Sequence, residues 1–334
     1  MGDRRVLMNA VTRLDRADLE AVLDRYDVGE PVDFWPAAHG IENSNYFVRT
    51  ATQGTPREWV LTILEQAPNA GAVFAPLLDL CFAAGLPVAP VRRNAAGNLQ
   101  ESLRGKPLLL TPRLHGTHPQ VPSAAQVAAL GATIAKLHLT THNPSFATPN
   151  HPRDESWLSR MAKTVSGQLT ADDAGLLECA LRRVTSLLRR EGLAGLPRGI
   201  IHGDLFRDNV LFDGDRLTGL LDFHHASNGW LIYDLAVAVN DWCSDLEGRL
   251  NEGQANALLA AYHEHRALTQ AEIERFPDFM TYAALAFWLS RLSAAAKAQA
   301  GEAVRIKDPG EFQRIITDRL SREIAPDTLG PPRG

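Results

Sequence analysis

The stretch that decides the fold of this chain is residues 200–212, which read IIHGDLFRDNVLF. It has an apolar start, a compact polar part and an apolar exit, a pattern typical of a loop between two buried strands. The polar part carries His202, Asp204 and Asn209. Taken singly, each of these residues is typical of a solvated turn or a cap. Together, at this spacing, they favour a functional site.

A predicted hairpin brings a further acid to this loop. Asp222 follows Asn209 by thirteen residues, and the turn residues 213–216 lie between them. Because a hairpin folds its ends together, we expect the Asn209 and Asp222 side chains to face one site. Carboxylate and amide oxygens suit Mg²⁺, and triphosphate oxygens can complete its octahedron. Asp204 is then left to orient a substrate hydroxyl for phosphoryl transfer.

Length and composition limit the class of protein. The 334 residues are enough for two domains or two lobes, and 45% are hydrophobic and 22% charged. A net charge of -5 argues against nucleic acid as the main partner, because phosphate binding needs a basic surface. No apolar run of about 18 residues and no apolar signal core are present, so we expect no membrane contact and a cytoplasmic location. Three widely spaced cysteines fit neither a zinc site nor a disulfide framework.

The first 110 residues predict a small antiparallel sheet with helices. Strand-like runs at 45–50 and 59–64 flank a turn at 51–57, and a buried strand is expected at 107–110. Helices are expected at 12–26 and 72–84, and a hairpin tip at 96–98.

The rest of the chain is mainly helical by pattern. Ser123 and Gln126 form a capping box that opens a long helix. Further helices are expected at 171–190, 233–242, 252–263, 269–298 and 309–320. The sequence therefore predicts an α+β protein with an N-terminal sheet lobe, residues 1–112, and a helical C-terminal lobe, residues 113–334. We expect the ligands to bind in a cleft between the lobes.

The polar motif resembles a known superfamily. His202-Gly203-Asp204 with Asn209, then Asp222-Phe223 and Asp234-Leu235-Ala236, resembles the catalytic half of the aminoglycoside phosphotransferase and choline kinase superfamily. That superfamily has the two-lobed protein-kinase-like fold. Four shorter stretches are similar to its bacterial homoserine kinases, namely residues 42–48, 203–212, 240–245 and 307–312. The likeness extends from about residue 12 to residue 322.

The resemblance implies a function and the roles of the motif residues. It implies a kinase that uses ATP and Mg²⁺ to phosphorylate the side-chain hydroxyl of L-homoserine, a step towards threonine. Asp204 would be the catalytic acid, and Asn209 and Asp222 the magnesium ligands. Asp234 would be a buried acid that steadies the loop, and His202 a scaffold residue. The alternatives are a kinase of another small alcohol, such as an aminoglycoside, choline or a hydroxylated amino acid, and a nucleotide-binding pseudokinase.

Nucleotide contacts are expected in the N-terminal lobe. Residues 39–45 stand where protein kinases have a glycine-rich loop, so we assign Gly40, Ser44 and Asn45 to nucleotide contact, with a plain turn as the alternative. Thr62, which we also assign to nucleotide contact, stands where most of the superfamily has a phosphate-binding Lys, and the helix at 72–84 has no Glu to pair with such a Lys.

The segment after the strand at 107–110 would be the hinge beside adenine. Pro112 has no N–H group to donate, so we assign the adenine contact to the backbone of Arg113 or Leu114.

An amino-acid substrate needs partners for its ammonium and carboxylate groups. Asp241 and Asp245 are four residues apart, on one face if the helix extends that far, and are assigned to the ammonium group. Arg207, Arg291 or Arg305 is expected to bind the carboxylate group, with solvent-exposed charge as the alternative for each.

Overall fold

The structure of the protein is a computed structural model that describes residues 12–37, 43–65, 70–142, 148–189, 193–299 and 307–322. The chain divides into two compact units, Met1–His115 and Gly116–Gly334. We call them unit 1 and unit 2 and describe each by itself. The predicted lobe boundary after residue 112 lies three residues before the division.

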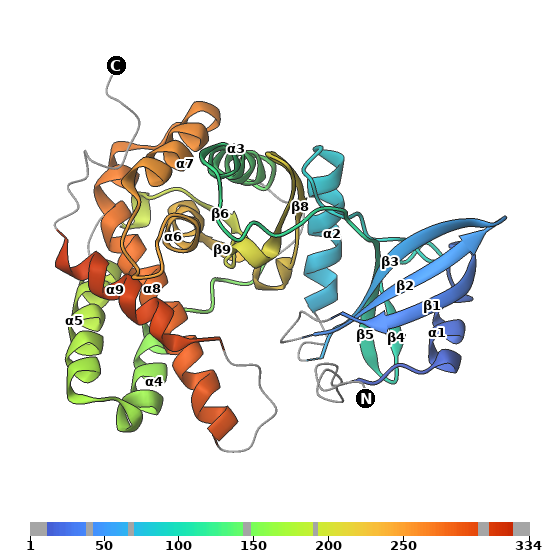
Figure 1. The fold of residues 1–334 in the computed structure, drawn as a ribbon, viewed down its shortest axis with the longest axis horizontal. Helices are drawn as coiled ribbons and strands as arrows, with labels where there is room; N and C mark the ends of the chain where they lie inside the picture. Colours follow the sequence, from blue (N-terminus) through green and yellow to red (C-terminus); the bar gives the residue numbers. More distant parts are fainter. Residues whose placement is uncertain are drawn as a thin grey trace. The chain divides into compact units, whose positions relative to one another are not determined.

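Unit 1 is built on one five-stranded antiparallel sheet with the strand order β1-β2-β3-β5-β4 (Figure 1). Its elements are α1 (Arg16–Leu23), β1 (Glu30–Pro36), β2 (Ser44–Thr52), β3 (Thr55–Ile63), α2 (Ala70–Ala83), β4 (Glu101–Leu103) and β5 (Lys106–Pro112).

The two faces of this sheet differ in character. On one face, apolar side chains from α1 and from alternate positions of the strands form a buried core that includes Leu19, Val48, Leu61 and Leu110. Along β2 and β3, every second side chain points to the other face and is only half-buried. This second face carries the predicted nucleotide-contacting residues Asn45 and Thr62, so we call it the open face.

Three expectations for unit 1 are wrong in detail. No strand was predicted over residues 30–36, but β1 forms there as an edge strand, where Pro31 and Pro36 are tolerated. The helix expected at 12–26 is restricted to α1, which begins after the capping residue Asp15. A turn is present at the expected tip at 96–98, where the Gly97 N–H donates to the Asn94 carbonyl oxygen at 2.9 Å, but the hairpin of β4 and β5 turns at Arg104 and Gly105, both with positive φ.

Unit 2 is mainly helical, with two small two-stranded sheets. Its helices are α3 (Ala124–Thr140), α4 (Glu155–Val165), α5 (Ala171–Leu188), α6 (Leu231–Trp242), α7 (Glu252–His265), α8 (Gln270–Gln299) and α9 (Pro309–Ser321). Its strands are β6 (Arg198–Ile201), β7 (Val210–Asp213), β8 (Arg216–Leu220) and β9 (Ser227–Trp230).

Local sequence signals account for most of these helices. The predicted capping box at the start of α3 is present, since Ser123 accepts from the Gln126 N–H and Gln126 accepts from the Ser123 N–H. Helix α4 was not predicted, although Asp154 caps its start and its buried positions, Leu158, Ala162 and Val165, recur at helical spacing. Helices α3 and α7 pack closely along each other (Figure 1).

The small sheets of unit 2 hold the motif loop. Strand β6 pairs with β9, and β7 pairs with β8 in the predicted hairpin. The loop between β6 and β7 therefore starts from one sheet and ends in the other. Within the part of the chain that the structure describes, no helix is long and apolar enough to cross a membrane.

Candidate active site

The motif loop of unit 2 is held in place from several sides. Gly203 has φ +78°, and a Cβ atom there would lie 3.1 Å from the His225 carbonyl oxygen, so glycine suits this position. The indole N–H of Trp242 donates to the Leu205 carbonyl oxygen at 3.0 Å. The Phe206 ring packs edge-on against Phe287, with centroids 4.5 Å apart. The loop is thus fixed to α6 and α8 by packing as well as by its strands.

Asp204 and Asn209 are in direct contact. The Asn209 Nδ2 group donates to the Asp204 side-chain Oδ2 at 2.8 Å and to the Asp204 carbonyl oxygen at 2.7 Å. The Asp204 side chain is half-buried. Because both hydrogens of its amide are used in this way, the Oδ1 atom of Asn209 is the part left to bind another group, and it has no protein donor among the described residues.

The hairpin places Asp222 beside Asn209. The Leu221 N–H donates to the Asn209 carbonyl oxygen at 2.9 Å, and Asp222 is the next residue. Asp222 adopts a left-handed conformation, φ 63° and ψ 58°, and its carboxylate contacts the His224 ring. Desolvation opposes ionisation of Asp222, but the hydrogen bond from His224 and the neighbouring histidines hold its pKa below the ordinary value. Asp222 is therefore ionised, and the hairpin brings its backbone to within one residue of the partner of Asn209.

A buried acid supports this loop from below. Asp234, at the start of α6, is fully buried and accepts from the His202 and Gly203 N–H groups at 2.7 and 2.8 Å. The His138 Nε2 atom lies 3.1 Å from the same carboxylate. Burial opposes ionisation of Asp234, but these hydrogen bonds and nearby histidines keep its pKa low. Asp234 thus fixes the backbone two residues before Asp204.

His202 joins the loop to the hairpin. Its Nε2 atom lies 2.8 Å from the Leu221 carbonyl oxygen, and its Nδ1 atom accepts from the Asp204 N–H at 3.3 Å. Complete burial lowers the pKa of His202, so the ring is neutral. This arrangement agrees with a scaffold role, because both ring nitrogens contact backbone.

Two of the predicted substrate residues are paired with each other, and the third lies apart. Asp241 is buried and accepts from the Arg207 N–H and Nε at 2.7 and 3.2 Å. Helix α6 ends at Trp242, so the expected shared helix face of Asp241 and Asp245 is wrong. Asp245 is exposed and pairs with Arg249 at 2.8 Å. Its role in substrate binding stays a prediction.

The C-terminal stretch at 307–312 contacts the same loop. Lys307 Nζ lies 2.6 Å from the Asp208 carboxylate, and Arg291 pairs with Glu311 at 2.5 Å. The Arg207 Nη2 atom is 3.9 Å from Glu311. Arg207 and Arg291 therefore both have acidic partners, whereas Arg305 lies outside the described residues.

In unit 1, two of the residues predicted to contact the nucleotide touch each other, and a third points to the opposite face of the sheet. Asn45 and Thr62 are direct partners across β2 and β3, and the Thr62 hydroxyl donates to Asn45 Oδ1 at 2.7 Å. Ser44 points to the core face, where its hydroxyl donates to Glu65 at 2.5 Å. Glu65 also pairs with Lys106, which is on that side of the sheet. Gly40 lies outside the described residues.

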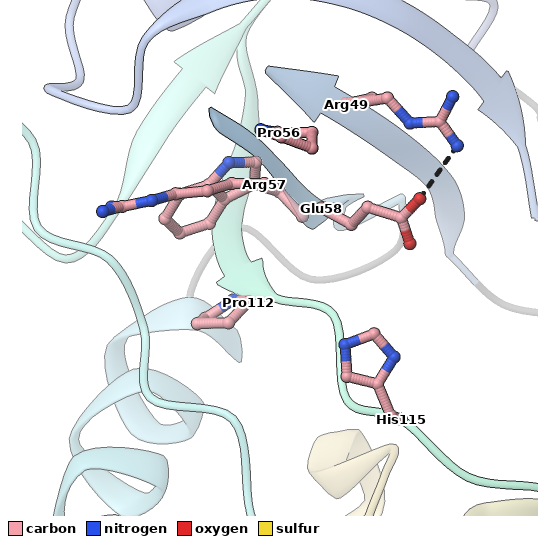
Figure 2. Close-up of a pocket in the computed structure, with 7 residues that line it drawn as sticks. Arg49, Pro56, Arg57, Glu58, Pro112 and His115 are labelled. Atoms are coloured by element: carbon pink, nitrogen blue, oxygen red, sulfur yellow. Dashed lines mark hydrogen bonds and ion pairs between the residues drawn. The ribbon is translucent and has the colours of Figure 1, made fainter. Parts of the chain in front are cut away.

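The predicted hinge residues differ in their free groups. The Arg113 N–H donates to the Glu58 carbonyl oxygen at 3.0 Å, and its guanidinium pairs with the Glu58 carboxylate at 2.9 Å. Leu114 makes no backbone hydrogen bond within the described part of the chain. Beside this segment is a hollow of about 710 Å³, where Figure 2 shows the Arg49–Glu58 pair, Pro112 and His115 on its wall. The backbone groups of Leu114 are therefore available for a contact with adenine. The N–H group of Arg113 is already donated to Glu58.

Sequence reasoning missed three polar residues near the loop. Arg153, His151 and Tyr233 each have a fully enclosed polar atom without a hydrogen-bond partner among the described residues. Arg153 and His151 belong to an irregular segment, where no periodic pattern indicates burial. Tyr233 directly precedes the predicted structural acid, and that position was the one signal available for it.

Comparisons with known proteins agree on one family. A family model described as the phosphotransferase enzyme family matches residues 33–268. A homoserine kinase of Pseudomonas aeruginosa (strain LESB58) is 41% identical over 95% of this chain and 98% of its own. A homoserine kinase of Methylobacillus glycogenes is 37% identical over 94% of this chain and 96% of its own.

A solved structure shows that the fold is shared as well. The amicoumacin kinase hAmiN matches with a TM-score of 0.68 at 15% identity, covering 96% of each chain. The expected α+β, protein-kinase-like fold is therefore confirmed, with an antiparallel sheet in the N-terminal part and helices in the C-terminal part. The chain belongs to the phosphotransferase enzyme family.

Proposed function

We propose that this protein transfers the γ-phosphoryl group of ATP to the side-chain hydroxyl of L-homoserine, giving ADP and O-phospho-L-homoserine. The observation that carries this proposal is the identity of 41% to a homoserine kinase over 95% of the chain. The contact between Asp204 and Asn209, with Asp222 beside them, supplies the groups that this reaction needs.

Asp204 is the residue that orients the acceptor. Its Oδ2 atom is fixed by the Asn209 amide, which leaves the rest of the half-buried carboxylate to accept a hydrogen bond from the substrate hydroxyl. The hydroxyl oxygen attacks the γ-phosphorus, the bond to the β–γ bridging oxygen breaks, and the hydroxyl proton passes to Asp204. Because the transition state of phosphoryl transfer is loose, correct positioning contributes more than a strong base.

The residues beside Asp204 fit a magnesium site. Asn209 Oδ1 has no protein donor among the described residues, and Asp222 offers an ionised, partly exposed carboxylate. These two oxygen donors would hold Mg²⁺, which when bound to the nucleotide would neutralise phosphate charge. The Leu221–Asn209 backbone hydrogen bond keeps the two donors together.

The open face of the unit 1 sheet is proposed to contact the nucleotide. The Thr62 hydroxyl fixes Asn45 Oδ1, so the Asn45 amide hydrogens are directed away from Thr62 and are available for a phosphate oxygen. Most of the superfamily has a lysine at the position of Thr62, whereas Asn45 and Thr62 are neutral. The metal ion and backbone N–H groups must therefore neutralise more of the phosphate charge. The Ser44 hydroxyl is buried and donates to Glu65, so Ser44 would contact the nucleotide through its backbone.

Asp241 remains our candidate for the substrate ammonium group. Its Oδ2 atom accepts both Arg207 hydrogen bonds, whereas Oδ1 has no donor within the described residues. Burial raises the pKa of Asp241, and the contacts with Arg207 oppose that rise. A substrate ammonium group at Oδ1 would further favour the ionised form.

The test is ADP release with purified protein, ATP and Mg²⁺ over a panel of acceptors: L-homoserine, L-serine, L-threonine, choline and an aminoglycoside. We expect turnover with L-homoserine to exceed that with every other acceptor. In the Asp204→Asn variant we expect kcat to fall by about 10²- to 10⁴-fold with little change in the KM for ATP.

This variant is also the control for contaminating kinases, because it keeps the size and fold of the wild type. Turnover confined to another alcohol would contradict the substrate proposal. ATP binding without turnover of any acceptor would indicate the pseudokinase alternative. Near-normal turnover by folded Asp204→Asn would contradict the role of Asp204.

A further inference from the structure

Arg153 of unit 2 is a buried cation without an acidic partner. The residue is 9% exposed, and its Nη1 atom is enclosed without a hydrogen-bond partner. Among the described residues, its guanidinium has no acidic partner; its neighbours are the Phe287 ring, 3.9 Å from the Arg153 Cζ atom, and the Tyr233 hydroxyl. Burial of a charge is unfavourable unless the charge is paired, so this arrangement calls for an anion.

Arg319, the more deeply buried of the two, shows the contacts of an arginine with a structural role in this protein. Arg319 is 1% exposed, and its guanidinium donates to Asn240 at 3.1 Å, to the Gly248 carbonyl oxygen at 3.2 Å and to Ser244 at 2.6 Å. It also pairs with Asp318. Every nitrogen of Arg319 is satisfied within the protein, whereas the Nη1 atom of Arg153 has no such partner among the described residues.

Further unpartnered donors surround Arg153. Tyr233 is fully buried beside the Arg153 guanidinium, and its hydroxyl has no acceptor for its own hydrogen in the described part of the chain. The His151 ring lies 4.5 Å from the Tyr233 ring, and its Nε2 atom is likewise enclosed without a partner. The Tyr282 hydroxyl donates to the Arg153 carbonyl oxygen at 2.5 Å and so fixes the backbone at this point. The cluster therefore has a rigid frame and more than one donor to offer.

Packing connects this cluster to the motif loop. Phe287, which lies under Arg153, packs at 4.5 Å against Phe206. The Phe206 N–H donates to the Asp204 carbonyl oxygen at 2.8 Å. Tyr233 directly precedes Asp234, which holds the backbone of the loop. An anion bound by Arg153 would thus lie in the neighbourhood of the acceptor hydroxyl.

The other candidates for binding an acceptor carboxylate are already engaged. Arg207 pairs with Asp241 and donates to the Gln120 carbonyl oxygen, and Arg291 pairs with Glu311. A substrate carboxylate at either position would have to compete with a protein carboxylate. At Arg153 it would meet no such competitor among the described residues.

We propose that Arg153 binds the α-carboxylate of the amino-acid acceptor, with the Tyr233 hydroxyl as a second donor. This inference rests on the proposed function and specifies how the site distinguishes an amino acid from a simple amino alcohol. A guanidinium group recognises a carboxylate through two parallel hydrogen bonds, which also fixes the orientation of the ligand. If either the guanidinium group or the substrate carboxylate is removed, the other group is left without these hydrogen bonds.

The kinetic test compares two acceptors that differ only in the carboxylate, L-homoserine and 3-aminopropan-1-ol. In the wild type we expect a strong preference for L-homoserine. In Arg153→Met we expect the KM for L-homoserine to rise by about 10- to 100-fold, with the KM for ATP unchanged and the preference between the acceptors largely lost. Arg153→Lys, which keeps the charge but not the fork, should recover part of the preference.

The matched control is Arg198→Met. Arg198 also stacks on an aromatic ring, with its Cζ atom 4.6 Å from the Trp230 ring, but it is exposed. We expect this variant to keep the wild-type preference for L-homoserine. An unchanged acceptor preference in Arg153→Met would overturn the inference, as would an equal loss in Arg198→Met.

A stability measurement separates ligand binding from a structural role. Without substrate, we expect Arg153→Met to melt at or above the wild-type temperature, because it removes a buried unpaired charge, and Arg319→Met to melt well below it. L-Homoserine should raise the melting temperature of the wild type but not of Arg153→Met. Marked destabilisation of substrate-free Arg153→Met would show that the arginine is structural and would overturn the inference.

The two proposals fail in different ways. If the wild type turns over L-homoserine but Arg153→Met keeps its acceptor preference, only the role of Arg153 is wrong. If the wild type turns over a different amino acid, the proposed substrate is wrong, and the same comparison with the decarboxylated analogue of that amino acid tests Arg153. Turnover confined to acceptors without a carboxylate would overturn both.

Discussion

Asn209 uses both ends of its amide at the candidate site. Its Nδ2 group donates to Asp204, and its Oδ1 atom faces no protein donor among the described residues. One side chain thereby links the acid proposed to orient the acceptor to the proposed metal site. A carboxylate at this position would lack the N–H donors, and an Asn209→Asp change would repel Asp204.

Asp222 is the residue whose change should affect metal and nucleotide together. In Asp222→Asn we expect the magnesium-dependent part of ATP affinity to weaken by at least about tenfold, since a direct ligand is lost. Asparagine tolerates the left-handed conformation of this position, so the fold should be kept. Calorimetric titration of ATP with and without Mg²⁺ measures the effect.

The control is the wild type titrated without Mg²⁺. Its affinity for ATP should be about as weak as that of Asp222→Asn titrated with Mg²⁺. An unchanged gain in affinity on adding Mg²⁺ to Asp222→Asn would count against its role as a ligand.

At the level of single residues, the sequence predicted which positions lie together where a motif existed. The hairpin expected between Asn209 and Asp222 is present, and the Leu221 N–H donates to the Asn209 carbonyl oxygen, whereas the direct contact of Asn209 with Asp204 was not predicted. Arg153 lies in an irregular segment, and its lack of a partner depends on distant residues that no local pattern encodes. Asp245 was grouped with Asp241 only by spacing, and the end of α6 at Trp242 separated them.

Among the elements, the contact between α3 and α7 depends on one small residue. A Cβ atom on Gly131 of α3 would lie 2.2 Å from the Leu258 carbonyl oxygen of α7. Backbone at that distance cannot move aside as a flexible side chain would. Glycine therefore allows the two helices to approach, and α3 also carries His138, which contacts Asp234.

Gly131→Ala should destabilise the protein by about 1–3 kcal/mol, because the added methyl group overpacks the helix contact. The matched control is Gly175→Ala in α5, where the added Cβ atom meets nothing within 4 Å. We expect that change to stabilise by about 0.5–1 kcal/mol, since alanine favours helix. Urea unfolding of both variants checks the pair, and equal effects of the two substitutions would contradict the packing argument.

Element types followed from the sequence better than their limits did. The capping box at Ser123 and the periodic helices of unit 2 were predicted close to their bounds, because those signals are local. Strand β1 was missed since its pairing with β2 outweighs its two prolines, and that pairing is a tertiary effect. The four-residue strand β6 pairs with β9 across residues 202–226, which local periodicity does not reveal.

On the scale of the whole molecule, buried histidines couple stability to pH. Burial lowers the pKa of His151 to about 3 and also lowers the pKa of His202. In the unfolded chain both titrate near pH 6.5. Below that pH the unfolded state therefore binds more protons than the folded state, and the free energy of unfolding falls as the pH falls.

Between pH 6.5 and 5 we expect His151 to contribute a loss approaching about 1.4 kcal/mol per pH unit, and His202 to contribute a loss in the same direction. Carboxylates with lowered pKa, such as Asp234, contribute stability that is lost only near and below pH 4, whereas protonation of Asp241, whose pKa is raised, would offset part of the loss; the effect of one histidine is therefore read from the difference between wild type and variant. Urea unfolding across the window measures the slope. His151→Phe should have a slope shallower by one histidine, and an unchanged slope would contradict the burial of a neutral His151.

The left-handed backbone of Asp222 has a consequence for how such a protein evolves. An aspartate at φ 63° is less stable there than a glycine, which adopts that conformation without strain. Selection for activity and selection for stability thus favour different residues at this one position. In a lineage that no longer needed the reaction, drift towards glycine would raise stability while removing a ligand. Glycine at the equivalent position would then mark relatives that have kept the fold and lost catalysis.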